Sequence, residues 1–163
     1  MPAPTMSHII GMIALVSLIF ILPLFYFHIV DNVTIEMKER ELKEVADYVS
    51  NSLWNLHILA NSADSNILLT KKLELPSSIR GSTYCVEIIY DQEGSQEGSA
   101  QYVTAYMRDS SEVSADSLVF PGLTVDSQTG YLIESGEKLV VAGCNLNSTG
   151  SYVWLKEEPL PIS

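Results

Sequence analysis

Charged side chains are absent from the first 30 residues of this chain, and positive charge is scarce in the rest. Lysine and arginine together number 9, against 20 aspartates and glutamates, which leaves a net charge of −11 at pH 7. A surface of this sign repels nucleic acid and anionic lipid headgroups. We therefore expect no nucleic-acid partner.

Catalytic and cofactor-binding motifs are also lacking. Of the three histidines, only His57 lies outside the N-terminal tail and the apolar run, and no His or Cys lies at metal-ligand spacing from it. Neither GxGxxG nor GxxxxGK[ST] occurs, so no phosphate-binding loop is predicted. The acidic stretches 91–98 and 109–116 lack EF-hand spacing, and we interpret them as solvated loops. We expect no enzymatic activity, no metal and no cofactor.

Cysteine is the last scarce residue type, represented by Cys85 and Cys144 alone. In an external domain the two could form a disulfide, whereas the alternative is a pair of buried free thiols. The sequence leaves both open. Asn32 and Asn147 each begin an Asn-x-Ser/Thr sequon, and Asn147 is the better glycosylation candidate because Asn-Ser-Thr-Gly is typical of an exposed turn.

An uncharged apolar run occupies residues 9–30. As a helix it would rise about 33 Å, which matches the hydrocarbon core of a bilayer. Pro23 lies inside the run and predicts a kink. We expect residues 1–8 to form a short irregular tail and residues 9–30 to cross the membrane once.

Residues 31–60 are predicted to continue the span as an amphipathic helix. Apolar residues recur there at three- and four-residue steps, which places them on one helix face; they are Leu42, Val45, Val49, Leu53 and Leu56. The chain's own β domain or a neighbouring subunit could cover this stripe. We expect the half nearer the membrane to meet another subunit, which makes the five residues a candidate helix interface.

Residues 61–156 are predicted to form an antiparallel sheet or small sandwich, and residues 157–163 a tail, so the fold class is α+β. Two hairpins are expected, one from 83–90 with 99–108 and one from 130–134 with 138–144. The other predicted strands are 67–74, a bent strand at 117–125, and 151–156.

Tyrosines are concentrated on these predicted strands. Tyr84 and Tyr90 share one strand face, and Tyr102 and Tyr106 share another, because alternate residues of a strand point the same way. Such tyrosines could form cross-strand core pairs or an exposed face for sugar or protein. The sequence leaves this choice open.

Two features of the sequence disagree about the side of the membrane on which the domain lies. Lys38, Arg40 and Lys43 follow the span, and by the positive-inside rule they favour a cytoplasmic domain. The cysteine pair, the sequons and the acidic composition favour the outside. We predict a single-pass protein of the cell membrane with an extracellular C-terminal domain.

The overall plan, an uncharged proline-containing span followed by an amphipathic helix and a β domain, resembles archaeal type IV pilin-like proteins and the membrane-anchored stator subunits of the archaeal swimming filament. The segment LELPSSIRGSTY at 73–84, followed by VEIIY at 86–90, is similar to a segment of such proteins. Pilin leaders have a basic residue and a glycine before the apolar run, whereas Gly11 lies inside it, so we expect an uncleaved anchor.

The resemblance implies a non-enzymatic subunit of a filament or cell envelope that associates with the lipid bilayer and with itself or other pilin-like subunits. The competing interpretation is a membrane-tethered sensor, ligand-binding or hydrolase domain.

Overall fold

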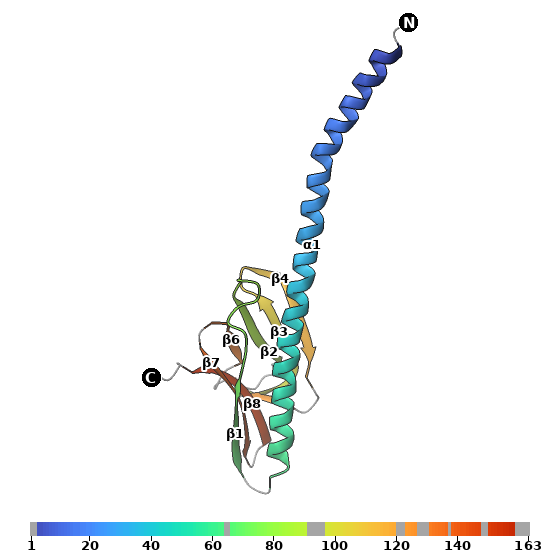
Figure 1. Ribbon diagram of the computed structural model, residues 1–163. Helices are drawn as coiled ribbons and strands as arrows, with labels where there is room; N and C mark the ends of the chain where they lie inside the picture. The colour runs from blue at the N-terminus through green and yellow to red at the C-terminus, as the bar shows by residue number, and fades with distance from the viewer. Residues whose placement is uncertain are drawn as a thin grey trace. The chain divides into compact units, whose positions relative to one another are not determined.

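The computed structural model describes residues 3–63, 66–90, 97–119, 123–126, 131–136, 138–147 and 150–158. Within them the chain forms one long helix followed by eight strands in two small, mostly antiparallel sheets (Figure 1). The predicted α+β class is confirmed. The chain divides into two compact units, Met1–Met37 and Lys38–Ser163, so the last part of the helix belongs to the same unit as the strands.

The helix, α1, spans Ala3–Asn61 without interruption. The prediction of an irregular tail at residues 1–8 is therefore wrong, because a proline such as Pro4 is tolerated in the first helical turn. The helix also continues through Pro23. It contains one candidate membrane span, whose large apolar side chains from Ile9 to Val30 are exposed all around the helix. A helix that is apolar on every side is typical of a membrane segment.

The strands form two groups that share one long strand. Their bounds are β1 Ile67–Leu73, β2 Tyr84–Tyr90, β3 Glu97–Met107, β4 Ser110–Leu118, β5 Thr124–Asp126, β6 Leu132–Glu134, β7 Leu139–Asn147 and β8 Gly150–Glu158. One sheet has the order β1-β7-β8-β5, with β5 and β8 parallel, and the other has the order β4-β3-β2-β6. The start of β3 pairs with β5 and its remainder with β2 and β4, which joins the sheets.

The predicted hairpin of β2 and β3 is confirmed, whereas two other strand predictions are wrong. The stretch 109–116, interpreted as a loop, belongs mostly to β4, in which buried Val113 and half-buried Ala115 alternate with exposed polar residues. The predicted hairpin at 130–134 and 138–144 does not form, because β6 pairs with β2 while β7 pairs with β1 and β8. The last strand also extends two residues beyond 156, to Glu158.

The apolar stripe of α1 is buried in the core of its own domain. Its five members are 0–7% exposed, and they share one cluster with strand residues such as Val86, Ile133 and Leu155. The sequence allowed the stripe to be covered by the chain's own β domain or by a neighbouring subunit. The chain's own strands cover it (Figure 1). The expectation that Leu42, Val45 and Val49 meet another subunit is therefore wrong, since the strands already cover them.

The outer edge of β4 is held by side chains of α1. The Lys43 Nζ donates to the Asp116 carbonyl at 2.6 Å, and the Ser50 hydroxyl donates to the Leu118 carbonyl at 3.0 Å. Lys43 also forms an ion pair with Asp47 at 3.0 Å. Burial would raise the pKa of Asp47, but hydrogen bonds with Ser117 and Lys43 and the Lys43 charge outweigh it and keep the pKa below its ordinary value. These contacts satisfy carbonyls that an open edge would offer to another strand.

The segment 73–84 folds into a turn that leads from β1 to β2. The Tyr84 hydroxyl donates to the Pro76 carbonyl at 2.7 Å, and burial raises the pKa of Tyr84 to about 12. Ile79 is buried, and its backbone pairs with Ser82 across a turn in which Gly81 has φ 78°. Glycine adopts that φ without strain, so the spacing of Pro, Ile, Gly and Tyr in this segment has a local structural role.

Candidate functional site

The two cysteines are both free thiols, so the disulfide does not form. On β2, Cys85 alternates with buried Tyr84 and Val86 and lies on the sheet face away from the core. Cys144 on β7 lies inside the core. Cys85 therefore lies outside the core and Cys144 inside it, and the alternative of unpaired thiols is the one observed.

The two sequons lie in different settings. Asn32 is on α1, exposed, with its Nδ2 3.3 Å from Nε2 of His28. Asn147 ends β7, opposite Gly150 at the start of β8. The Asn147 side chain and residues 148–149 lie outside the described residues. Glycosylation at either position stays a prediction.

Buried His57 lies at the centre of a partly exposed polar cluster between α1 and the β7–β8 hairpin. Its Nδ1 is 2.9 Å from the Ser151 hydroxyl, and its Nε2 is 2.9 Å from Nδ2 of Asn61. The Ser151 hydroxyl also lies 3.3 Å from Sγ of Cys144, and the Trp54 ring stacks on the imidazole with centroids 5.4 Å apart. The sequence offered no metal-ligand partner for His57 and did not indicate Ser151, because 94 residues separate the two.

This cluster contains the residue types of a hydrolase, but its hydrogen bonds run in the wrong direction. The Asn61 amide donates to Nε2, so the neutral imidazole carries its proton on Nδ1 and donates it to Ser151. A general base would have to accept the serine proton instead. Burial also raises the pKa of the Cys144 thiol and so disfavours a reactive thiolate. The cluster joins the end of α1 to the β7–β8 hairpin.

Stability should depend on pH through His57. Burial lowers its folded-state pKa below 6.5, and its described partners Trp54, Asn61, Ser151 and Cys144 carry no charge that would favour the imidazolium. The unfolded chain therefore takes up a proton first as the pH falls below 6.5. We expect a constant urea midpoint above pH 6.5 and a falling midpoint from pH 6.5 to 5.

The matching control is His57→Gln, which removes the titrating group. Its midpoint should be lower than that of the wild type at pH 7.5 but should change less between pH 7.5 and 5. An equally steep decline in both proteins would show that another group titrates in this range. Asp47 would not account for it, because its pKa lies below 3.8.

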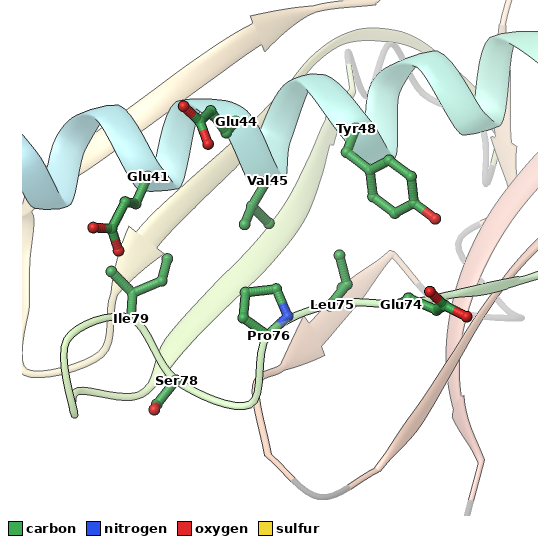
Figure 2. Close-up of a pocket in the computed structure, with 9 residues that line it drawn as sticks. All are labelled: Glu41, Glu44, Val45, Tyr48, Glu74, Leu75, Pro76, Ser78 and Ile79. Atoms are coloured by element: carbon green, nitrogen blue, oxygen red, sulfur yellow. The ribbon is translucent and has the colours of Figure 1, made fainter.

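An open hollow of about 330 Å³ lies between α1 and the segment after β1. Figure 2 shows Val45 and Tyr48 extending from the helix toward Leu75 and Pro76. Three carboxylates complete the lining, those of Glu41, Glu44 and Glu74. We refer to this hollow as the α1 groove.

The charges of the α1 groove are largely compensated. Arg80 pairs with Glu41 at 2.9 Å, and Arg40 lies 3.9 Å from Glu44. The Lys71 ammonium lies 5.2 Å from the centre of the Tyr48 ring and donates to Ser52. Within the described residues no group of three His, Cys, Asp or Glu side chains is placed to hold a metal ion. The α1 groove therefore has the form of a shallow apolar hollow with a polar rim.

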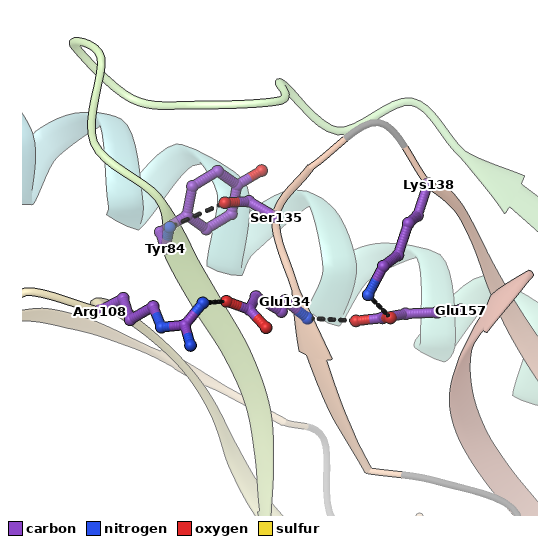
Figure 3. Close-up of polar contacts among 6 residues, drawn as sticks. All are labelled: Tyr84, Arg108, Glu134, Ser135, Lys138 and Glu157. Atoms are coloured by element: carbon purple, nitrogen blue, oxygen red, sulfur yellow. Dashed lines mark hydrogen bonds and ion pairs between the residues drawn. The ribbon is translucent and has the colours of Figure 1, made fainter. Parts of the chain in front are cut away.

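A second polar set fixes the short strand β6 in place (Figure 3). Arg108 of the β3–β4 turn pairs with Glu134, and Lys138 pairs with Glu157 of β8. The Glu134 backbone N–H donates to Glu157 Oε1 at 2.6 Å, and the Ser135 hydroxyl accepts from the Tyr84 backbone N–H at 2.8 Å. These contacts connect β6 to both sheets and satisfy donors at its edge. We interpret the set as structural.

The tyrosines divide between core and surface. Tyr84 is buried, and Tyr90 packs edge-on against Tyr131 with centroids 5.5 Å apart. Tyr102 and Tyr106 alternate with buried Val103, Ala105 and Met107, so they lie on the face of β3 that points away from the core. Tyr84 and Tyr90 of β2 therefore face the core, whereas Tyr102 and Tyr106 of β3 face away from it, and a binding role for the latter stays a prediction.

A short apolar stripe on α1 beyond the span was not identified from the sequence. Val33 and Met37 are each 43% exposed and lie four residues apart, in line with Val30 three residues earlier. This spacing puts the three on one face of the helix. The periodicity would have revealed the stripe, but the longer stripe from Leu42 onward obscured it.

Comparisons with known proteins found no relative: no family model matches the chain, and neither a curated protein nor a solved structure does.

Proposed function

We propose that this chain is a non-enzymatic, membrane-anchored assembly subunit of pilin-like type, with its β domain outside the cell. The observation that carries the proposal is that the two parts of α1 differ in how far their side chains are exposed. One part contains the candidate span and is exposed all around, and the other buries one face in the β domain. Such a helix can anchor a folded domain and still offer side chains to neighbouring helices.

The proposed contact between subunits is the stripe of Val30, Val33 and Met37. It replaces the buried stripe that the sequence suggested. These side chains are 40–43% exposed, and burying apolar surface against a second helix removes it from water. The proposed partner is another copy of this chain or another pilin-like envelope subunit.

Placement outside the cell rests on the acidic composition and on exposed Asn32 in its sequon. The free thiols give this placement no support, because disulfides are the signature of an oxidising compartment. The archaeal pilin-like resemblance agrees with the placement and belongs to the same proposal.

Single cysteines on α1 test the assembly in native membranes. In a Cys85→Ser background, cysteine at Val33 or Met37 should give dimers with a short thiol cross-linker. Cysteine at Ile35 is the matched control, because it is equally exposed and apolar but points about 200° away around the helix from Val33. We expect at least about fivefold more dimer at the first two positions if the stripe is the contact.

Two outcomes would contradict the proposal. Equal cross-linking at Val33, Met37 and Ile35 would indicate random collision of monomers. Cross-linking with a membrane-impermeant reagent only after cell lysis would place the stripe, and the domain after it, on the cytoplasmic side.

A further inference from the structure

The sheet β4-β3-β2-β6 has one face in the core and one face away from it. On β3, Tyr102, Thr104 and Tyr106 are half-buried, while the residues between them are fully buried. Residues two apart on a strand point to the same face. The outward face therefore carries two tyrosines with a threonine between them.

The strand register places an acidic row across the middle of this face. Thr104 lies opposite Asp116 of β4 on one side and opposite Glu87 of β2 on the other. Directly opposed residues have Cβ atoms about 4.5–5.5 Å apart, so the two carboxylates flank Thr104. The Thr104 hydroxyl donates to Asp116 Oδ1 at 2.8 Å. Tyr102 and Tyr106 lie above and below this row.

Apolar side chains border the acidic row. Leu118 is opposite Tyr102 and is 83% exposed, and Leu132 is opposite Glu87 and is 48% exposed. Solvent-exposed leucines beside half-buried tyrosines are typical of a surface that binds another protein. We refer to Glu87, Tyr102, Thr104, Tyr106, Asp116 and Leu118 together as the tyrosine–acid face.

The negative charge of the face is not compensated within the described residues. Neither Glu87 nor Asp116 forms an ion pair with a described residue, and nearby Lys43 binds the Asp116 backbone carbonyl while pairing with Asp47. Burial raises the pKa of Tyr106, and the Glu87 carboxylate on the neighbouring strand raises it further.

We propose that the tyrosine–acid face is a docking surface for a basic segment of another protein, with a Lys or Arg side chain placed over Thr104. There the cation would meet carboxylates on two sides and tyrosine rings above and below, and each of these groups attracts a cation. Leu118 and Leu132 would contact apolar residues next to it. A second copy of this chain is a poor occupant of this face, because it has only 9 Lys and Arg against 20 Asp and Glu and no basic segment to place over the acidic row. The inference goes beyond assembly through α1 and does not depend on it.

The test uses the full-length protein in phosphatidylcholine nanodiscs, whose zwitterionic lipid does not attract cations. The probe is a fluorescent peptide, Gly-Lys-Leu-Lys-Leu-Lys-Gly, and its anisotropy is measured at 50 and 300 mM salt against empty nanodiscs. The same peptide with Glu in place of Lys is the charge control. We expect saturable binding of the lysine peptide alone, weaker at high salt.

Two matched pairs of variants locate the binding. Glu87→Gln with Asp116→Asn removes the acidic row while keeping its shape, and should weaken binding about tenfold, as expected for two half-exposed charge pairs. Glu44→Gln with Glu74→Gln makes the same charge change in the α1 groove and should alter binding less than twofold. Tyr102→Ala should weaken binding, whereas Tyr102→Phe, which keeps the ring, should not. Unchanged circular dichroism and melting temperature confirm that each variant folds.

Four results would overturn the proposal. Equal losses in the two charge variants would mean that the peptide responds to overall charge, and a loss in the Glu44/Glu74 variant alone would assign binding to the α1 groove. Displacement of the peptide by maltoheptaose, or no saturable binding of the lysine peptide, would remove the basic segment as the occupant.

Discussion

Leu53→Ala should lower the free energy of unfolding by about 2–5 kcal/mol, the range measured for truncating fully buried leucines. Leu53 is 0% exposed and belongs to the core cluster in which α1 meets both sheets. The substitution removes apolar contacts and leaves a cavity that the surrounding strands cannot fully close. Urea unfolding of the full chain in detergent, followed by tryptophan fluorescence, measures the change.

The same helix provides a matched control. Leu59→Ala makes the identical substitution at a side chain that is 60% exposed, so helix propensity changes equally while packing hardly changes. We expect a change of less than about 0.5 kcal/mol there. Similar small effects at both positions would mean that this part of α1 does not pack on the sheets, and would reopen the stripe as an interface between subunits.

Gly143→Ala should be the other strongly destabilising substitution, by about 1–3 kcal/mol or more. Gly143 on β7 lies directly opposite Trp154 on β8. A Cβ built at Gly143 would lie 2.2 Å from the Cε2 and Cζ2 atoms of the indole ring, a distance that real atoms do not adopt. Trp154 is only 9% exposed, so its ring has little room to move aside. The thermal unfolding midpoint of the full chain measures the effect.

Two variants distinguish this clash from a general effect of replacing glycine. A Cβ at Gly136 would meet no atom within 4 Å, so Gly136→Ala should leave the midpoint unchanged within about 2 °C. In a Trp154→Ala background, Gly143→Ala should lose most of its cost, because the ring is gone. An undiminished cost in that background would assign the effect to the backbone of β7 instead.

Periodicity carried most of the successful sequence-based prediction. An uncharged run of bilayer length identified the candidate span, a three- and four-residue repeat identified the buried face of α1 from Leu42 to Leu56, and alternating residues around Tyr84–Tyr90 identified the first hairpin. Each of these patterns lies within one element or two adjacent ones. Local sequence is sufficient there because the same side chains that form the pattern form the structure.

The candidate sites depended on contacts that no local pattern records. His57 and Ser151 are in contact although 94 residues separate them, and β6 pairs with β2 instead of with β7, its predicted partner. Such long-range pairing depends on which faces can be buried together. The polar strand β4 escaped prediction for the same reason, since its small core-facing residues are buried only once β3 and α1 cover them.

Sequence by itself determined a membrane-length helix, its amphipathic continuation and an acidic domain of short strands. Tertiary structure alone decided that Cys85 faces away from the core while Cys144 lies inside it, that the chain's own strands cover the stripe at Val45 and Val49, and that Tyr102 and Tyr106 face outward beside two carboxylates. The physical reason is that alternation shows which residues share a face of a strand, whereas the packing of sheets and helix decides which face is buried.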